Sequence, residues 1–214
     1  MSFWTFENVR RALAADWIAP PRDGASPPFG ASIDTRSLRP GQIFFALRGE
    51  RTDGLRFLRD AAERGAAMAV VARDAAIPAD APPSLPIAGV DDPAAALAEL
   101  ARAYRASPAF RPRVVAITGS NGKTTTTRLA CAVLSRTLRG TQSPKSYNNH
   151  LGLPLTLLNA REDDGFVVCE AGTSGPGEIA FLGGIARPDV AVITSVGRAH
   201  VERLGSLAGV AREK

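Results

Sequence analysis

The sequence is poor in aromatic residues and has no cluster of basic residues, and both features argue against a nucleic-acid-binding protein. Aromatic side chains make up 6% of the 214 residues, and the arginines are scattered along the chain. Nucleic-acid binding favours basic patches interleaved with aromatics. The net charge of +5 therefore does not indicate a nucleic-acid partner, and an acidic, phosphate-bearing substrate explains it equally well.

Cysteines and long apolar runs are also scarce. The two cysteines, Cys131 and Cys169, lie in apolar patterns, which favours buried free thiols over a disulfide and fits a reducing cytoplasm. Charged residues such as Glu7 and Arg11 interrupt the first 20 positions, so they predict neither a signal peptide nor a membrane span. We expect a cytoplasmic monomer without membrane insertion.

Lysine is the scarcest of the charged residues. It occurs at only three positions, Lys123, Lys145 and Lys214, whereas arginine supplies the positive charge elsewhere. Lysine is a compact point charge whose amine can lose its proton in a suitable environment. A lysine retained in such a chain therefore indicates a task that arginine cannot perform.

The most informative stretch, 114–125, predicts a phosphate-binding loop. An apolar run typical of a buried strand leads into Thr-Gly-Ser-Asn-Gly-Lys-Thr-Thr. Gly119 and Gly122 allow a sharp turn that points N–H groups at an anion, and the following helix adds the positive end of its dipole. Lys123 can reach the β- and γ-phosphates of a nucleotide, and the Thr124 hydroxyl can bind Mg²⁺.

This loop differs from the common pattern G-x-x-x-x-G-K-[ST], because Ile117 occupies the position of the first glycine. The alternative is an ordinary strand-to-helix turn. The apolar strand before the loop and an apolar stripe of Leu129, Val133 and Leu134 after it argue against that alternative. We predict that a nucleoside triphosphate contacts Gly119, Ser120, Asn121, Gly122, Lys123, Thr124 and Thr125.

The element pattern predicts an α/β fold with a domain boundary near residue 90. Residues 1–90 show a helix after Thr5, strands near 32–34, 42–47 and 68–72, and a helix over 55–64. Residues 91–214 show a helix from Pro93, strands at 114–118, 166–170 and 190–194, and helices at 124–138, near 178–182 and from Ser206. This alternation implies a parallel sheet with its site at the carboxyl ends of the strands. Three strands are few for such a sheet, so the sequence looks truncated at Lys214.

Three residues of the second domain carry potential chemistry. Glu170 ends an apolar strand, where a carboxylate would hold a metal ion in a nucleotide site. The alternative is a solvated acid, which the apolar residues before it disfavour. His200 follows the third strand, and a lone histidine is more often structural or merely exposed. On composition alone Lys214 would be a surface lysine.

Together these segments resemble the Mur ligase family. In the second domain the resemblance lies in 118–125, in the Ser-Tyr-Asn-Asn-His-Leu-Gly-Leu-Pro-Leu-Thr run of 146–156, in 170–179 and in 199–214. In the first domain, 32–36, 40–50 and 53–54 resemble the uridine-nucleotide domain of the type that adds a dipeptide. The resemblance covers nearly the whole chain.

The resemblance implies a small N-terminal α/β uridine-nucleotide domain, followed by the first part of a P-loop-like parallel-sheet ATPase domain. The remainder of the ATPase domain and a third domain would be missing beyond Lys214. Members of this family use ATP and Mg²⁺ to phosphorylate the terminal carboxylate of a UDP-N-acetylmuramoyl-peptide, and an amine then attacks the acyl phosphate. The closest type adds D-alanyl-D-alanine to UDP-N-acetylmuramoyl-tripeptide in cytoplasmic peptidoglycan synthesis. We expect the fragment to bind without turnover.

The resemblance also implies roles for single residues. The catalytic residues would be Lys123, Glu170, His200 and Lys214. Thr124 and Glu170 would hold one Mg²⁺, His200 a second, and Lys214 would act as a carbamylated lysine. Lys145 would be a further phosphate contact. The uridine substrate would contact Ser32, Asp34, Thr35, Arg36, Leu47, Arg48, Asn148 and Asn149.

Alternatives remain open for several of these roles. Arg36 and Arg48 could be solvated surface charges, and Asn148-Asn149 an ordinary turn. The sequence departs from the family pattern at Ser174-Gly175, Ser195 and Arg198, in loops that face substrate and nucleotide. The competing functions are another ligase of this family, a folylpolyglutamate-type relative, and a binding module without turnover.

Overall fold

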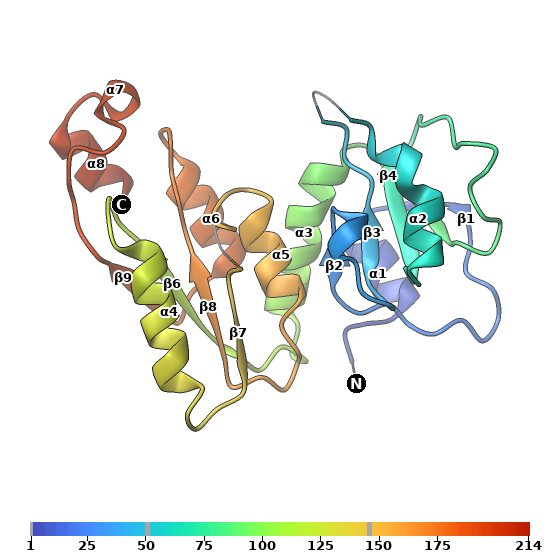
Figure 1. Cartoon of the computed structure of the whole chain (residues 1–214), viewed down its shortest axis with the longest axis horizontal. Helices are drawn as coiled ribbons and strands as arrows, with labels where there is room; N and C mark the ends of the chain where they lie inside the picture. The colour runs from blue at the N-terminus through green and yellow to red at the C-terminus, as the bar shows by residue number, and fades with distance from the viewer. Residues whose placement is uncertain (1, 50–51, 145–146) are drawn as a thin grey trace. The chain divides into compact units, whose positions relative to one another are not determined.

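The computed structural model describes residues 2–49, 52–144 and 147–214, so Lys145 lies outside the described residues. The chain forms two compact units, Met1–Ala103 and Tyr104–Lys214, whose elements are drawn in Figure 1. The units divide within helix α3 (Pro93–Ala106), whereas the sequence pattern placed the boundary near residue 90, just before this helix.

In its described part, the first unit contains a five-stranded sheet in the order β1-β5-β4-β3-β2. The strands are β1 (Asp16–Ala19), β2 (Ala31–Ser32), β3 (Ile43–Phe45), β4 (Met68–Ala72) and β5 (Ile87–Val90). Strand β1 is antiparallel to β5, and the other pairs are parallel. The helices are α1 (Phe6–Ala12), η1 (Thr35–Ser37), η2 (Gly54–Phe57) and α2 (Leu58–Glu63), of which η1 and η2 are 3₁₀ helices.

Local capping explains where several elements of the first unit begin. The Thr5 hydroxyl accepts the Asn8 N–H at 3.1 Å, which confirms the predicted start of α1. Asp92 caps α3 in the same way through the N–H of Ala94 at 2.8 Å. The strand predicted near 32–34 is shorter than expected, because Asp34 instead caps η1.

The second unit contains a parallel sheet that has four strands among the described residues, in the order β7-β8-β6-β9. The strands are β6 (Arg113–Thr118), β7 (Gly140–Gln142), β8 (Phe166–Glu170) and β9 (Val190–Ile193). The helices are α4 (Lys123–Leu134), α5 (Gly152–Leu158), α6 (Glu178–Ala186), α7 (Val201–Leu204) and α8 (Leu207–Glu213). The parallel sheet confirms the α/β class. Strand β7 was missed, because its short Gly-Thr-Gln run has no apolar pattern.

The strand order brings three loops to one edge of this sheet. Strand β6 lies between β8 and β9, with Ile117 opposite Glu170 and Thr118 opposite Ile193. All four strands are parallel, so the loops after β6, β8 and β9 leave at the same carboxyl edge.

Helix α4 is shorter than predicted, and its buried face matches the prediction only in part. It ends at Leu134 rather than at residue 138, and Leu129 and Val133 are 62% and 68% exposed. The buried face instead contains Thr127, with Ala130 and Leu134 packed on the sheet. Of the predicted stripe, Leu134 packs on the sheet as expected, whereas Leu129 and Val133 were wrong. The loop fixes where the helix starts, and the resulting helical positions place these two residues outward.

The described helices include none that is long and apolar enough to cross a membrane. Both cysteines are free, as expected; Cys169 is fully buried in β8 and Cys131 is partly buried in α4.

Burial raises the pKa of the Cys169 thiol to about 12. The reactive thiolate is therefore scarce at roughly pH 8, far below that value. We predict that iodoacetamide modifies native protein at Cys131 and reaches Cys169 only after unfolding in urea, as read by peptide mass spectrometry. Equal native labelling of the two thiols would contradict the buried position of Cys169.

Candidate functional site

The loop after β6 has the backbone geometry of an anion cradle. Gly119 and Gly122 have φ angles of 140° and 81°, which favour glycine. A Cβ on Gly119 would collide with the side chain of Thr194, which follows β9. The loop therefore turns at its two glycines, and the first of them has no room for a side chain.

Helix α4 opens directly out of this loop with its first turn uncapped. Among the described residues, no side chain caps the helix at Gly122. The first N–H groups of a helix lack intrahelical partners and, with the helix dipole, attract anions. The Lys123 ammonium donates to the Gly119 carbonyl at 2.8 Å, so it is folded back over the loop.

The segment after β9 fixes the other side of the loop. Ser195 accepts two hydrogen bonds: from the Ser120 N–H at its carbonyl (2.9 Å) and from the Asn121 N–H at its hydroxyl (3.0 Å). The Ser120 hydroxyl donates to the Gly197 carbonyl at 3.1 Å. Ser195, one of the departures from the family pattern, thus anchors the loop. The backbone N–H groups of the loop region that could still contact a phosphate are those at the start of α4.

Glu170 is a buried carboxylate surrounded by hydrogen-bond donors. Glu170 is only 2% exposed. Its carboxylate accepts hydrogen bonds from the Thr124 hydroxyl and from the Asn148 side-chain amide, each at 2.8 Å. Its backbone N–H donates to Ser143 Oγ at 3.0 Å. The structure thus brings Glu170 and Thr124 together, and it places the Asn148 amide, for which the resemblance implies a substrate contact, on Glu170.

Lys214 ends the chain at the close of α8. Burial lowers the pKa of its ammonium, the charge of Lys123 lowers it further, and Glu213 and Glu178 oppose the shift. Lys214 is therefore close enough to Lys123 for the two positive charges to interact. His200 precedes α7, and its Nδ1 lies 3.9 Å from the Glu202 carboxylate.

The predicted uridine-binding residues of the first unit follow β2 and β3, two parallel strands, and so lie at one edge of that sheet. Asp34 holds the Arg36 guanidinium at 2.7 Å, and this hydrogen bond lowers the pKa of Asp34. Thr35 is buried, Leu47 is half-buried and Arg48 is exposed. Ser32, Asp34, Thr35 and Arg36 thus lie at the end of β2, and Leu47 and Arg48 follow the neighbouring strand β3. Asn148 and Asn149 belong to the second unit.

Two family models match the chain. The Mur ligase middle domain matches residues 117–214, and the catalytic domain of the Mur ligase family matches residues 30–105. The chain belongs to the Mur ligase family. Similar proteins include the UDP-N-acetylmuramoyl-tripeptide–D-alanyl-D-alanine ligases of Bacillus subtilis (43% identical over 185 residues) and Escherichia coli (40% over 184). Each match covers 86% of this chain and 39% of the relative, so the chain spans about two fifths of these proteins.

Solved Mur ligase structures share the fold. MurF from Acinetobacter baumannii superposes with a TM-score of 0.81 at 32% identity, over 99% of this chain and 45% of that one. MurF from Thermotoga maritima in complex with ADP gives a TM-score of 0.69 at 34% identity, over 86% and 42%. The family and fold implied by the resemblance are thus confirmed.

The oxygen donors of this Mur ligase chain suit Mg²⁺. The Thr124 hydroxyl and the Glu170 carboxylate are the hard ligands this ion prefers, and Mg²⁺ commonly uses one or two carboxylates together with substrate phosphates and water. Across residues 2–49, 52–144 and 147–214, no group of three or more His, Cys, Asp or Glu could hold a metal ion. A magnesium site here would therefore be completed by the phosphates of the nucleotide.

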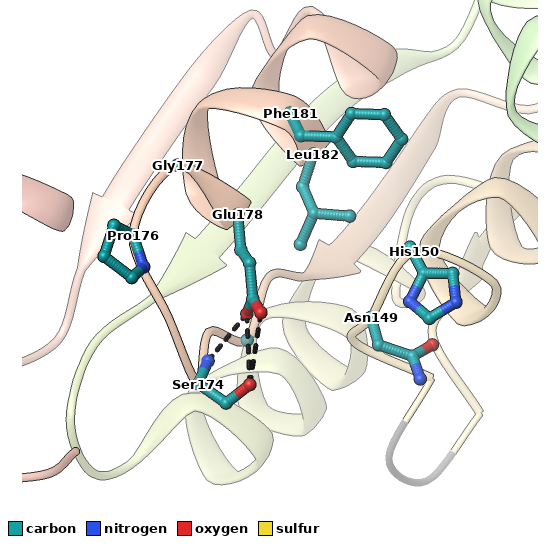
Figure 2. A pocket seen from close by; sticks show the side chains of 9 residues that line it. Asn149, His150, Ser174, Pro176, Gly177, Glu178, Phe181 and Leu182 are labelled. Carbon is teal, nitrogen blue, oxygen red and sulfur yellow. Dashed lines mark hydrogen bonds between the residues drawn. The ribbon is translucent and has the colours of Figure 1, made fainter. Parts of the chain in front are cut away.

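A cavity of about 470 Å³ lies beside the loop that follows β8 (Figure 2). It is lined by Asn149, His150, Gly172, Ser174, Pro176, Gly177, Glu178, Phe181 and Leu182. The Ser174 N–H donates to Glu178 at 2.7 Å and lowers the pKa of that carboxyl, so Glu178 is an anion at neutral pH. In Figure 2, Asn149 and His150 lie across the cavity from Glu178.

Sequence reasoning missed most of this cavity. Asn149 was predicted from the resemblance, and its side-chain oxygen Oδ1 also accepts the Gly152 N–H at 2.9 Å at the start of α5. His150 and Phe181 had no distinguishing spacing, because they come from separate segments that meet only in the fold. Most of the lining residues lie in the 146–156 and 170–179 segments that carried the resemblance, but only Asn149 had been assigned a role.

Proposed function

We propose that this chain binds MgATP in its second unit and a uridine-linked peptide in its first. The whole enzyme would be an ATP-dependent ligase that joins D-alanyl-D-alanine to UDP-N-acetylmuramoyl-tripeptide in cytoplasmic peptidoglycan precursor synthesis. The relatives named for this reaction are 43% and 40% identical to the chain. The observation that carries the proposal is the uncapped start of α4, with Lys123 over the loop and Thr124 on Glu170 at 2.8 Å.

The residues of the second unit would neutralise charge as two anions react. Lys123 and the first amides of α4 would bind the β- and γ-phosphates, and Thr124 and Glu170 would hold Mg²⁺, which when bound neutralises phosphate charge. A carboxylate oxygen of the peptide would form a bond to the γ-phosphorus as the bond to ADP breaks. The amine of the dipeptide would then add to the acyl carbon, lose its proton and displace phosphate.

In the first unit, the uridine nucleotide would bind at the edge formed by the ends of β2 and β3. The Asp34–Arg36 pair at 2.7 Å keeps one guanidinium in a fixed place, and Arg48 is exposed at the same edge. Arginine is well suited to a diphosphate because its guanidinium offers several donors in one plane. In this proposal Arg48 contacts the diphosphate and Arg36 is positioned by Asp34.

Binding and turnover separate this function from its alternatives. We expect calorimetry to detect MgATP and UDP-N-acetylmuramoyl-tripeptide on the chain, and a phosphate-release assay with D-alanyl-D-alanine to give no turnover. Release of phosphate that depends on the dipeptide would show that the fragment is active. Failure to bind either ligand would contradict the proposal, and binding of a different UDP-peptide alone would favour another member of the family.

We propose further that Lys214 forms a carbamate whose oxygens bind a second Mg²⁺ together with His200. The neutral amine would attack carbon dioxide, forming an N–C bond and releasing a proton to water. The lowered pKa of Lys214 increases the share of neutral amine at a given pH.

We expect ¹³C NMR with labelled bicarbonate to show one protein carbamate signal. The signal should be missing from the Lys214→Met variant and retained in Arg212→Ala, a change at an exposed neighbouring position. A spectrum without a carbamate at saturating bicarbonate, with or without Mg²⁺, would count against this role of Lys214.

A further inference from the structure

The first turn of α6 is capped by a carboxylate from another helix. Glu213, the last residue of α8, accepts the Gly177 N–H at 2.8 Å and the Ile179 N–H at 2.9 Å. The Thr173 hydroxyl lies 3.3 Å from the same carboxylate. These N–H groups have no partners within α6, and an anion at a helix N-terminus also interacts favourably with the dipole.

This contact, here called the Glu213 clamp, joins the loop after β8, the start of α6 and the end of α8. The outer side of α8 is exposed, with Leu207 at 49%, whereas Val210 is fully buried. Helix α8 is only seven residues long, and a helix of that length depends on tertiary contacts for its stability. The clamp therefore fixes the end of α8 that carries Lys214.

Lys214 follows Glu213 directly and continues the helical hydrogen bonding. Its N–H donates to the Val210 carbonyl at 3.1 Å, so its backbone is set by the same turn that Glu213 anchors. The clamped loop leads back to Glu170 through Gly172, whose N–H donates to the Asn148 carbonyl at 2.7 Å. A shift of the clamp would thus move Lys214 relative to Glu170 and the phosphate loop.

We propose that Glu213 is a positioning residue that holds Lys214 beside the phosphate loop by anchoring α8 to α6. The inference rests on the proposed function, in which Lys214 acts on MgATP. Glu213 takes no part in the chemistry itself, because its oxygens face the donors of α6 and Thr173. Sequence reasoning missed it, since the residue before a candidate lysine carries no signal of its own.

A double-mutant cycle tests whether Glu213 acts through Lys214. The dissociation constant of MgATP is measured for the unaltered chain, Glu213→Ala, Lys214→Met and the double variant. We expect Glu213→Ala to weaken binding by about tenfold when Lys214 is present and by less than about twofold in the Lys214→Met background. Glu213→Gln, which keeps one acceptor oxygen, should recover part of the loss, and Arg212→Ala is the matched control.

The outcomes distinguish positioning from simple stabilisation. Equal losses in both backgrounds would mean that Glu213 only stabilises the fold. An unchanged affinity of Glu213→Ala when Lys214 is present would also overturn the inference. Hydrogen exchange provides a check on the clamp: the Gly177 and Ile179 amides should exchange faster in Glu213→Ala and not in Arg212→Ala.

If the unaltered chain binds no MgATP, the proposed function fails and the clamp is still tested without ligand. The chain has three lysines, so reductive ¹³C-methylation gives a simple spectrum in which Lys214→Met assigns the Lys214 signal. That signal should move in Glu213→Ala and stay in place in Arg212→Ala. An unmoved signal would overturn the inference.

Discussion

Replacement of Lys123 by methionine is expected to weaken MgATP binding roughly 100-fold while the fold is kept. The Lys123 ammonium lies over the loop, 2.8 Å from the Gly119 carbonyl, where β- and γ-phosphates would pass. Hydrogen bonds to charged groups contribute about 1.5–3 kcal/mol each, and about 1.4 kcal/mol corresponds to a tenfold change in affinity. Methionine has a similar length and no charge. The loss of MgATP affinity therefore measures the contribution of the Lys123 ammonium rather than that of side-chain packing.

Calorimetry with MgATP measures this effect, and two variants serve as controls. Arg128→Met removes a positive charge from an exposed position of the same helix and should leave the affinity within about twofold, since exposed charges are screened by salt. Lys123→Arg keeps the charge but not the compact shape, and we expect intermediate binding. An affinity of Lys123→Met close to that of Arg128→Met would show that the loop does not hold phosphate through Lys123.

Replacement of Gly119 by alanine is expected to destabilise the second unit by about 2–4 kcal/mol. A non-glycine residue in a disfavoured backbone region costs of order 1–3 kcal/mol, and overpacking adds a similar amount. Here φ is 140°, and the new Cβ would collide with Thr194. Thr194 has little freedom to move away, because its hydroxyl is hydrogen-bonded to the Asn121 carbonyl at 2.5 Å.

The matched control is Gly183→Ala in helix α6. A Cβ at Gly183 meets nothing within 4 Å, so alanine should stabilise the unit by about 0.5–1 kcal/mol through helix propensity. Both tryptophans, Trp4 and Trp17, lie in the first unit, so their fluorescence does not report on the second. The unfolding of the second unit is instead followed by the alkylation of the buried Cys169 as the urea concentration rises. If Gly119→Ala unfolds no earlier than the unaltered chain, the loop conformation described above is wrong.

The parts of this structure that could be predicted are those set by short, continuous stretches of the sequence. Strands β4 and β8 have the predicted bounds, because each is a continuous apolar run in a parallel sheet buried on both faces. The glycine turn after β6 and the start of α4 were predicted because they lie in one short segment, and phosphate binding by this loop stays a prediction. Parallel strands share a carboxyl edge, so Glu170 could be placed near that loop from the strand pattern alone.

Contacts between distant segments explain what could not be predicted. Ser195 was noted only as a departure from the family pattern, yet it anchors the loop through the Asn121 N–H at 3.0 Å. The outward face of α4 depends on how the loop starts the helix, which apolar spacing does not reveal. Asn148 binds Glu170, a partner 22 positions away, so no local signal distinguished this role from a substrate contact.

The two helices α4 and α6 give the Glu213 clamp a second consequence. Each begins after a glycine with nearly the same backbone angle, φ of 81° at Gly122 and 83° at Gly177, so each could in principle receive a free anion. At α6, a tethered carboxylate competes with any such anion at a high effective concentration. In the proposed function a triphosphate would thereby be directed to α4, and an internal competitor, rather than a difference between the two helix ends, would discriminate between them.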